Sequence, residues 1–565
     1  MSTTINEIRP GAYFDSVVLM QLQRELAQLP GVLDAGVVMA TPANCELLTS
    51  SGFTFDTDAR SDDLLIVVEA ESEQIAHDAL AQVDELMSRK RHTQSEGFLP
   101  KSLQSAAGQL PDSSWVLVSV PGRYAAKVAR DGLDINRNVF LYSDNVPLKD
   151  EIELKQYATD KDLLMMGPDC GTAIIHGVGF GFANHVRQGS IGLVGASGTG
   201  LQVITAEIHR LGAGISHAIG TGGRDLDIEV GALTALKGLN LLAGDDDTNV
   251  IVLVSKPPDP EVASRLLLAA WRCGKPVVIN LIGHPPPARR LGPLHFASSL
   301  SDAASLAALL TQEGVVKGVN PSISHVPQGR KPGYVRGLMA GGTIAYEVAI
   351  GLQSVLGSLY SNLHIDGGRD LPDIWSSQGH AVLDLGDDTF TQGRLHPMMD
   401  NDYRIRRIKQ ETADEEVGVI LFDLVLGEGA HPDPASELAP VIAEIQQEAS
   451  QMNRVLEFVC IVIGTEDDPQ DLAHQIEQMT EVGAAVFQDI GEAIAAAISI
   501  TYPFQSKPSS QGKSDILSKP ISAINVGLRS FSESLRSQGA EAIDVDWRPP
   551  ASGDDRLASL LSKMK

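Results

Sequence analysis

The sequence predicts a multi-domain α/β protein. Its 565 residues correspond to roughly three to four domains at about 150 residues each. Short apolar runs alternate with amphipathic helical patterns along most of the chain, and 53 Gly and 30 Pro punctuate these segments. This alternation is typical of parallel sheets whose strands are connected by helices.

Composition narrows the classes of partner. The chain has 44 Lys and Arg against 72 Asp and Glu, a net charge of −28, and no basic block. Nucleic acids and anionic membranes bind clustered cations, so we predict neither as a partner. The apolar runs are much shorter than the ~20 residues of a membrane span, and the N-terminal segment lacks a signal-peptide pattern. We therefore expect a cytoplasmic protein.

The cysteines predict neither disulfides nor a metal site. The four of them, Cys45, Cys170, Cys273 and Cys460, form no C-x-x-C pair. Widely separated cysteines of this kind are typical of a reducing compartment, and we predict no bound metal.

The first two predicted domains cover residues 1–90 and 112–188. The first is a small α+β domain, with helices over 16–29 and from Glu73, and strands over 37–39 and 64–68. A linker is expected over 88–114. The second domain has strands over 115–120, 138–142 and 163–166 and helices over 124–131 and 149–160, which is half of a doubly wound domain.

The third predicted domain covers residues 189–325 and is flavodoxin-like. A strand over 190–194 leads through a Gly-rich turn into a helix over 201–211. Further strands are expected over 215–219, 249–254 and 275–281, with helices over 228–237 and 260–272.

The fourth predicted domain covers residues 330–565 and follows a linker over 317–332. It opens with the same strand, turn and helix at 334–339, 340–343 and 344–352, about 145 residues further on, which predicts an internal duplication. Strands over 417–424 and 455–462 alternate with helices over 434–452 and 471–480. A Ser/Lys/Pro-rich stretch over 505–520 precedes a C-terminal extension.

The two Gly-rich turns are the candidate phosphate site. A turn between a strand and a helix presents unpaired backbone N–H groups and the positive end of the helix dipole, which suit a phosphate. The predicted phosphate-binding residues are Gly195, Ala196, Ser197, Gly198 and Thr199 in the first turn and Gly341, Gly342 and Thr343 in the second. We expect the two turns to face one another and hold one tetrahedral anion. The spacing does not indicate a nucleotide, and the alternative is that the glycines serve only the backbone conformation.

Other candidates follow the carboxyl ends of strands, where doubly wound sheets bind ligands. Lys256 would neutralise a phosphate, Arg394 would grip a carboxylate, and His396 would move a proton. A predicted substrate loop contains Asp169, Cys170, Gly222, Gly223 and Arg224. The alternatives are a solvated Lys256, a His396 that only packs, and an inert buried Cys170 thiol. Asp387 and Asp388 could bind magnesium, but acidic turns are common.

These residues resemble the α-subunit superfamily of succinyl-CoA synthetase. The resemblance rests on Leu163–Thr172, on the phosphate turn at Gly189–Thr205 and on the loop at Gly220–Asp225. Within that superfamily the chain is most similar to the FdrA family, on motifs that include 11–20, 41–44, 255–258, 385–388, 393–398 and 525–531. The resemblance implies a Rossmann-like domain of the CoA-binding type at 112–188, and two flavodoxin-like domains of the synthetase type after it.

Departures from the synthetase pattern bear on function. The histidine that carries phosphate in synthetases would stand in the stretch 291–296, where the chain has only a displaced His295. Lys256 stands where the synthetases have the glutamate that orients that histidine. The first CoA-binding turn, G-x-T-G-x-x-G, is absent, and the sequence shows no ATP-grasp domain.

By resemblance, the FdrA family implies a subunit of oxamate carbamoyltransferase. That enzyme interconverts oxamate and carbamoyl phosphate with oxalurate and phosphate in allantoin breakdown. The implied partners are these small molecules and other subunits of a hetero-oligomer, and no cofactor is expected. An acyl-CoA ligase subunit, which would bind CoA, is the second hypothesis, and a scaffold that binds acyl phosphate without catalysis is the third.

Overall fold

The computed structural model describes most of the chain. The described residues are 3–10, 16–27, 29–40, 44–45, 48–49, 53–55, 59–60, 63–91, 100–284, 288–311, 333–391, 394–501, 520–526 and 528–546. The chain divides into two compact units, Met1–Pro503 and Phe504–Lys565. The predicted fourth domain, 330–565, therefore ends near residue 503, and its extension forms a unit of its own. The predicted linkers at 317–332 and 505–519 and the motif residues 11–15, 41–43 and 393 lie outside the described residues.

The first domain is a small antiparallel sheet with two helices. Its described elements are β1 (Thr3–Arg9), α1 (Ser16–Ala27), β2 (Val32–Met39), β3 (Leu64–Ala70) and α3 (Glu73–Arg91), and the strand order is β1-β3-β2. The sequence analysis missed β1, whose residues are all only partly buried. The core lies between the sheet and the two helices.

A three-stranded parallel sheet follows. Its strands β4 (Trp115–Val118), β5 (Asn138–Leu141) and β6 (Met165–Met166) are joined through α5 (Gly122–Asp134) and α6 (Leu148–Asp160). The short helix α4 (Leu103–Gln109) lies within the predicted linker 88–114, where Ser102 caps it by accepting a hydrogen bond from Ser105 N. None of its residues is buried, which is why no apolar periodicity marked it.

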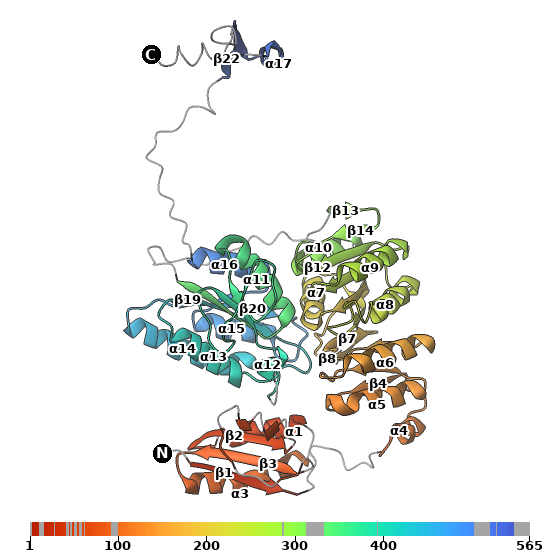
Figure 1. Ribbon diagram of the computed structural model, residues 1–565, viewed down its shortest axis with the longest axis vertical. Coiled ribbons are helices and arrows are strands. Elements are labelled where there is room, and N and C mark those ends of the chain that lie inside the picture. Colours follow the sequence, from red (N-terminus) through yellow and green to blue (C-terminus); the bar gives the residue numbers. More distant parts are fainter. Residues whose placement is uncertain are drawn as a thin grey trace, which may run out of the picture. The chain divides into compact units, whose positions relative to one another are not determined.

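The next sheet has the order β13-β14-β12-β11-β9-β10-β7-β8 (Figure 1). Its strands are β7 (Thr172–Ile175), β8 (Val178–Gly181), β9 (Gln188–Ala196), β10 (Ile215–Gly220), β11 (Val250–Ser255), β12 (Val277–Leu281), β13 (Arg290–Leu291) and β14 (Leu294–Phe296). The hairpin β7–β8 pairs with β10, although the predicted boundary at 188 assigned it to the preceding domain. Its residues follow the strand end at Met166, which disguised the change of sheet.

Helices cover both faces of this sheet. They are α7 (Gly198–Arg210), α8 (Leu233–Gly244), α9 (Pro260–Arg272) and α10 (Leu300–Thr311). Helix α8 starts five residues later than predicted, because Asp225 accepts hydrogen bonds from Thr234 N (3.1 Å) and Ala235 N (2.8 Å) and so fixes its first turn. The residue before α8, Ala232, has a left-handed conformation (φ 63°) that ends any earlier helix.

The last large sheet repeats this plan with the order β17-β16-β18-β15-β19-β20-β21. Its strands are β15 (Tyr334–Met339), β16 (Tyr360–Ser361), β17 (Arg369–Asp370), β18 (Ala381–Asp384), β19 (Val417–Val425), β20 (Glu457–Ile463) and β21 (Ala485–Phe487). The helices are α11 (Gly342–Leu356), α12 (Asp388–Thr391), α13 (Asp402–Thr412), α14 (Pro434–Gln451), α15 (Leu472–Glu481) and α16 (Ile490–Thr501). All described pairings are parallel.

One hydrophobic core joins the two large sheets. It includes Leu201 and Ile204 from α7, Ile344 and Ala345 from α11, and residues from α10 and α16. Because α7 and α11 share this core, their N-termini are held beside each other.

The second unit is separate and small. It contains β22 (Ser522–Val526), α17 (Arg529–Ser537) and β23 (Glu541–Val545), with the two strands parallel. Across the described ranges of the whole chain, no helix has the length and apolar character to cross a membrane.

Candidate functional site

The first Gly-rich turn is capped by its own residues. Ser197 is the N-cap of α7, is buried, and accepts a hydrogen bond from Gly200 N at 2.9 Å. This cap satisfies one of the helix's unpaired donors and points the others toward the carboxyl edge of the sheet.

The second turn is held from outside. Gly341 is the N-cap of α11 and has no side chain to cap it. Instead Asp423, at the adjacent strand β19, accepts a hydrogen bond from Ala340 N at 2.8 Å. Asp423 is fully buried beside Arg404, whose Nη2 lies 3.3 Å from its Oδ1. Burial raises the pKa of Asp423, opposed by Arg404 and by the amides of Ala340 and Gly341.

The structure brings the two turns into direct contact. Ser197 Oγ and Thr343 Oγ1 form a hydrogen bond, and a Cβ added at Gly341 would lie 2.3 Å from Thr199 Cγ2. Only a glycine fits at 341. The hydroxyl contact occupies the position directly between the turns, so an anion held by both helices must lie beside them rather than between Ser197 and Thr343.

Gly342 lies against a cation and a carboxylate. A Cβ added there would lie 2.9 Å from Lys256 Nζ and 2.5 Å from Asp384 Oδ2. Lys256 follows β11 directly and is partly buried. Asp384 ends β18 and is 5% exposed. The predicted cation therefore lies at the N-terminus of α11, together with a carboxylate that the sequence analysis did not select.

A hydrogen bond holds one carboxylate oxygen of Asp384. Its Oδ1 accepts a hydrogen bond from Gly386 N at 2.9 Å, while its Oδ2 faces Gly342. Burial raises the pKa of Asp384 to about 6, although Lys256 and the Gly386 amide favour the charged form.

His396 lies on the other side of Asp384 and is suited to donate a hydrogen bond. A Cβ added at Gly386 would lie 2.7 Å from His396 Nε2 and 3.2 Å from Asp384 Oδ1. Met398 N donates to His396 Nδ1 at 3.2 Å, so in the neutral ring the proton is assigned to Nε2. Burial, assisted by Arg404, lowers the pKa of His396 to about 4. A neutral Nε2–H polarises a carbonyl well, but its Nδ1 is occupied and does not act as a base.

The predicted substrate loop lies near Lys256, and several of its residues make packing contacts within the loop. Gly223 packs against Asp169, since a Cβ there would lie 3.1 Å from its Oδ2. Reduced hydration raises the pKa of Asp169 to about 6, with Lys256 opposing and Asp388 and Asp144 adding to the rise. Gly222 has a φ of 87° and lies against the Pro168 carbonyl, a close approach that only glycine permits.

Arg224 and Cys170 have structural contacts. Arg224 Nη2 lies 2.9 Å from the buried Glu151, which also pairs with Lys155 Nζ at 2.9 Å. Lys155 in turn contacts Asp225 at 2.7 Å, so this network ties the loop to α6. Cys170 is buried, and burial raises the pKa of its thiol to about 12, which suits the inert thiol rather than a nucleophile.

Arg394 packs against an aromatic ring. Its guanidinium stacks over the Tyr403 ring at 5.1 Å, and its backbone N donates to Thr391 O. Asp387 caps α12 by accepting from Thr389 N, and Asp388 is exposed. Across the described ranges, no group of three or more His, Cys, Asp or Glu side chains is arranged to hold a metal.

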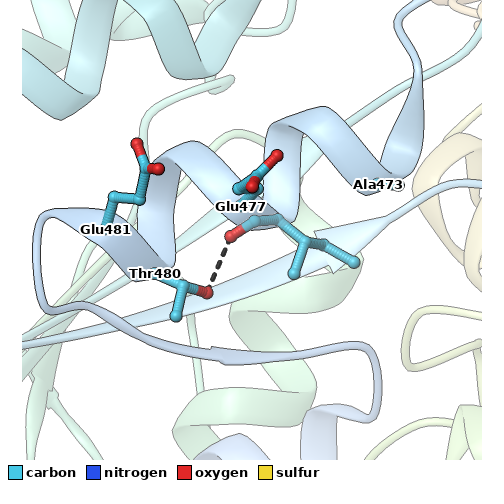
Figure 2. Close-up of a pocket in the computed structure, with 5 residues that line it drawn as sticks. Ala473, Glu477, Thr480 and Glu481 are labelled. Atoms are coloured by element: carbon cyan, nitrogen blue, oxygen red, sulfur yellow. Dashed lines mark hydrogen bonds between the residues drawn. The ribbon is translucent and has the colours of Figure 1, made fainter.

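His295 lies away from the carboxyl ends of the strands. It lies on β14 and pairs in register with Val278, near the start of β12, whereas Lys256 and the turns lie at the carboxyl ends of the strands. A surface hollow lies on α15 (Figure 2). The hollow is lined by Ala473, Ile476, Glu477, Thr480 and Glu481. The carboxylates of Glu477 and Glu481 disfavour the binding of an anion there.

Sequence analysis missed Asp384 and Asp423. Each is a single carboxylate within an otherwise apolar strand, in the stretches Ala381–Leu385 and Val417–Val425. A lone acid in a buried run was the available signal, because burying a carboxylate is costly unless it has a partner or a task.

Comparisons with known proteins agree with this architecture. Residues 188–321 match the succinyl-CoA ligase-like flavodoxin domain, residues 338–500 match the CoA-ligase domain, and residues 1–102 match the heavy metal-associated domain of AllF. The uncharacterized protein YahF of Escherichia coli is 40% identical over 486 residues, 84% of this chain and 94% of YahF. The chain belongs to the YahF family.

The family lies in the succinyl-CoA synthetase α-like superfamily. Succinate–CoA ligase subunit alpha 1 of Archaeoglobus fulgidus is 27% identical over 31% of this chain and 60% of its own length. Malate–CoA ligase subunit alpha of Methylorubrum extorquens is 25% identical over 32% of the chain and 62% of its own. The chain thus spans about 60% of the length of these ligase subunits.

The family model that matches residues 1–102 is named for heavy metals. The donors do not fit such an ion. Residues 1–102 contain one cysteine, Cys45, and within the parts of the chain that the structure covers no metal-binding cluster of three acids, histidines or cysteines occurs. Soft metals are held by thiolates and imidazoles, and residues 1–102 contain only Cys45, His77 and His92 as such donors.

Proposed function

We propose that this YahF-family chain binds the phosphate of an acyl phosphate at the N-termini of α7 and α11, as a subunit of a carbamoyltransferase. The observation that carries the proposal is the pair of touching helix N-termini with Lys256 Nζ beside Gly342. Two helix dipoles and one cation are a strong anion site. Motifs shared with the FdrA family point to oxamate and carbamoyl phosphate as substrates, with oxalurate and phosphate as products.

The site's chemistry supports transfer without a phosphohistidine. The amide nitrogen of oxamate would attack the carbamoyl carbon, the bond between that carbon and the phosphate oxygen would break, and one proton of the amide nitrogen would pass to phosphate. Such a reaction needs alignment of the reactants, a polarised carbonyl and a stabilised leaving group. His396 Nε2–H is the proposed carbonyl donor and Lys256 the proposed phosphate cation. Arg394, stacked on Tyr403, remains the candidate for the oxamate carboxylate.

The superfamily relationship favours the second hypothesis, an acyl-CoA ligase subunit. The family models and the ligase relatives support it directly. Two features of this chain weigh against it. His295 lies away from the turns, and the start of α5, where a CoA-binding turn is expected, is covered by the carbonyls of Asp144 and Asn145. A Cβ at Gly122 would lie 2.3 Å and 2.6 Å from these oxygens, which repel a diphosphate.

An assay of the full chain, alone and with the products of neighbouring genes, separates the hypotheses. We expect phosphate-dependent consumption of oxalurate by a cytoplasmic hetero-oligomer, with no dependence on CoA. Ligation of an acid to CoA with nucleotide consumption would establish the second hypothesis instead. Phosphate binding with neither activity in any combination of subunits would leave a non-catalytic scaffold.

Labelled phosphate donors give an independent check. The proposal expects no base-stable label on any histidine, with His295→Ala indistinguishable from the parent. Label that is lost in His295→Ala would restore the phosphohistidine mechanism.

A further inference from the structure

An anionic group already lies at the N-terminus of α11. Asp384 Oδ2 would be 2.5 Å from a Cβ at Gly342, and Lys256 Nζ would be 2.9 Å from the same point. The side chain is 5% exposed, and the hydrogen bond from Gly386 engages only its other oxygen. An oxygen of a nearly buried carboxylate is therefore aimed at the place where the proposed phosphate would lie.

Electrostatic repulsion disfavours a phosphate next to an ionised Asp384. Two like charges a few ångströms apart in a partly desolvated site raise the cost of keeping both ionised. One cation, Lys256, faces them both. The buried Arg404 is already paired with Asp423, so it adds little net charge.

Among the described groups named as acting on Asp384, only Lys256 is positively charged. Asp387 follows on the same loop and Asp423 lies on β19, and both favour a protonated Asp384. Tyr346 approaches from α11, where the Asp384 charge helps to raise its phenol pKa. His396 is neutral at pH 7, since burial lowers its pKa to about 4. Asp169 is a second carboxylate near Lys256, on the side of Gly223.

We infer that the site takes up a proton with its anion: Asp384 becomes protonated when phosphate binds, and its carboxyl donates a hydrogen bond to a phosphate oxygen. This inference rests on the proposed phosphate site. The reaction would then leave phosphate in contact with a neutral acid rather than a carboxylate. Release of phosphate would return the proton to solvent.

Linkage predicts the size of the effect. The pKa of Asp384 is about 6 without the anion, and an added dianion raises it further. Between these two values, anion affinity falls by about tenfold for each unit of rising pH, because one proton is bound together with the anion. Below the pKa of Asp384 in the anion-free protein, the affinity for the anion does not change with pH.

Sulfate is the clean probe, because it keeps two charges from pH 5 to 8 whereas phosphate itself titrates. Calorimetry on the full chain at pH 5, 6, 7 and 8, in buffers of different ionisation enthalpy, measures affinity and proton uptake together. We expect up to one proton taken up at pH 7, and at least about a tenfold loss of affinity from pH 6 to 8.

Two matched variants locate the proton. Asp384→Asn should bind sulfate with nearly constant affinity from pH 6 to 8 and tighter than the parent at pH 8. Asp169→Asn is the control, since the pKa of Asp169 is also about 6 and it also lies near Lys256. It should keep the parent's pH dependence and proton uptake.

The outcomes are distinct. Sulfate and phosphate binding without proton uptake would refute the role of Asp384 and leave the phosphate site standing. Proton uptake that is lost in Asp169→Asn instead would assign it to Asp169. No binding of either anion by the parent would refute both the site and this inference.

Discussion

The two Gly-rich turns follow the same pattern of strand, turn and helix but are stabilised differently. In the α7 turn, the helix cap comes from Ser197 of the turn itself, which also contacts Thr343. In the α11 turn, Gly341 provides no cap, and Asp423 from β19 binds Ala340 N while Lys256 and Asp384 lie against Gly342. The cap of the α7 turn comes from the turn itself, whereas the α11 turn is supported by residues from three other segments of the chain. We therefore expect the α11 turn to carry ligand selectivity and pH dependence, and the α7 turn to supply a fixed helix end.

The largest expected effect is on the remote support of α11. Asp423→Ala removes the acceptor for Ala340 N and leaves Arg404 buried without its partner, which costs about 3–5 kcal/mol of folding free energy. Urea unfolding followed by circular dichroism measures this change. Asp423→Ala together with Arg404→Leu should recover much of the loss, because no unpaired charge remains. A loss below about 1 kcal/mol in Asp423→Ala would show that the turn does not depend on β19.

The pH dependence of stability tests Asp384 without any ligand. Its raised pKa means that the folded state holds a proton that the unfolded chain releases, so its stabilising effect is full below about pH 4 and is lost as pH rises through about 6. Asp384→Asn should therefore stabilise the ligand-free protein at pH 7 by up to about 2 kcal/mol and change little at pH 4.

Thermal melts of the parent and Asp384→Asn from pH 4 to 8 measure this difference. Asp387→Asn is the control, because Asp387 lies on the same loop and caps α12. If the parent and Asp384→Asn had equal melting temperatures at all pH values, burial of the ionised Asp384 would not destabilise the folded protein. A stabilisation that appears only in Asp387→Asn would assign the charge effect to the loop.

The smallest expected effect on stability is at the α7 turn. Ser197→Ala removes the cap on Gly200 N and the contact with Thr343, which costs about 1 kcal/mol. Thr343→Val is the companion variant, because it removes only the contact and keeps the shape of the side chain. Urea unfolding should place Thr343→Val between the parent and Ser197→Ala. The reverse order would mean that the contact between the turns, and not the cap, stabilises this region.

Local signals explain which parts of the fold the sequence predicted. Helix α9 has its predicted bounds because Asp259 caps it and Pro260 occupies its first turn. Strand β15 also has its predicted bounds. By contrast, the hairpin β7–β8 joins its sheet through pairing with β10, more than 40 residues later, and no local pattern carries that information.

The same division applies to the site. The glycines and Ser197 follow from one short motif, and Lys256 follows from its place after a strand. Asp384 and Asp423 required the strand order β18-β15-β19, which sets their carboxylates on either side of the α11 turn. The role of Arg394 in binding a carboxylate stays a prediction, and the structure shows its guanidinium over the Tyr403 ring.

Phosphate binding by Lys256→Ala is the measurement that tests the central claim most directly. Calorimetry with inorganic phosphate on the full chain at pH 6 should give one site per chain. Loss of a charge-assisted contact worth about 1.5–3 kcal/mol should weaken it roughly tenfold to a hundredfold in Lys256→Ala. Lys237→Ala removes a surface lysine paired with Asp162 and should bind as the parent does. Parental affinity in a normally folded Lys256→Ala protein, or no phosphate binding by the parent, would contradict the account.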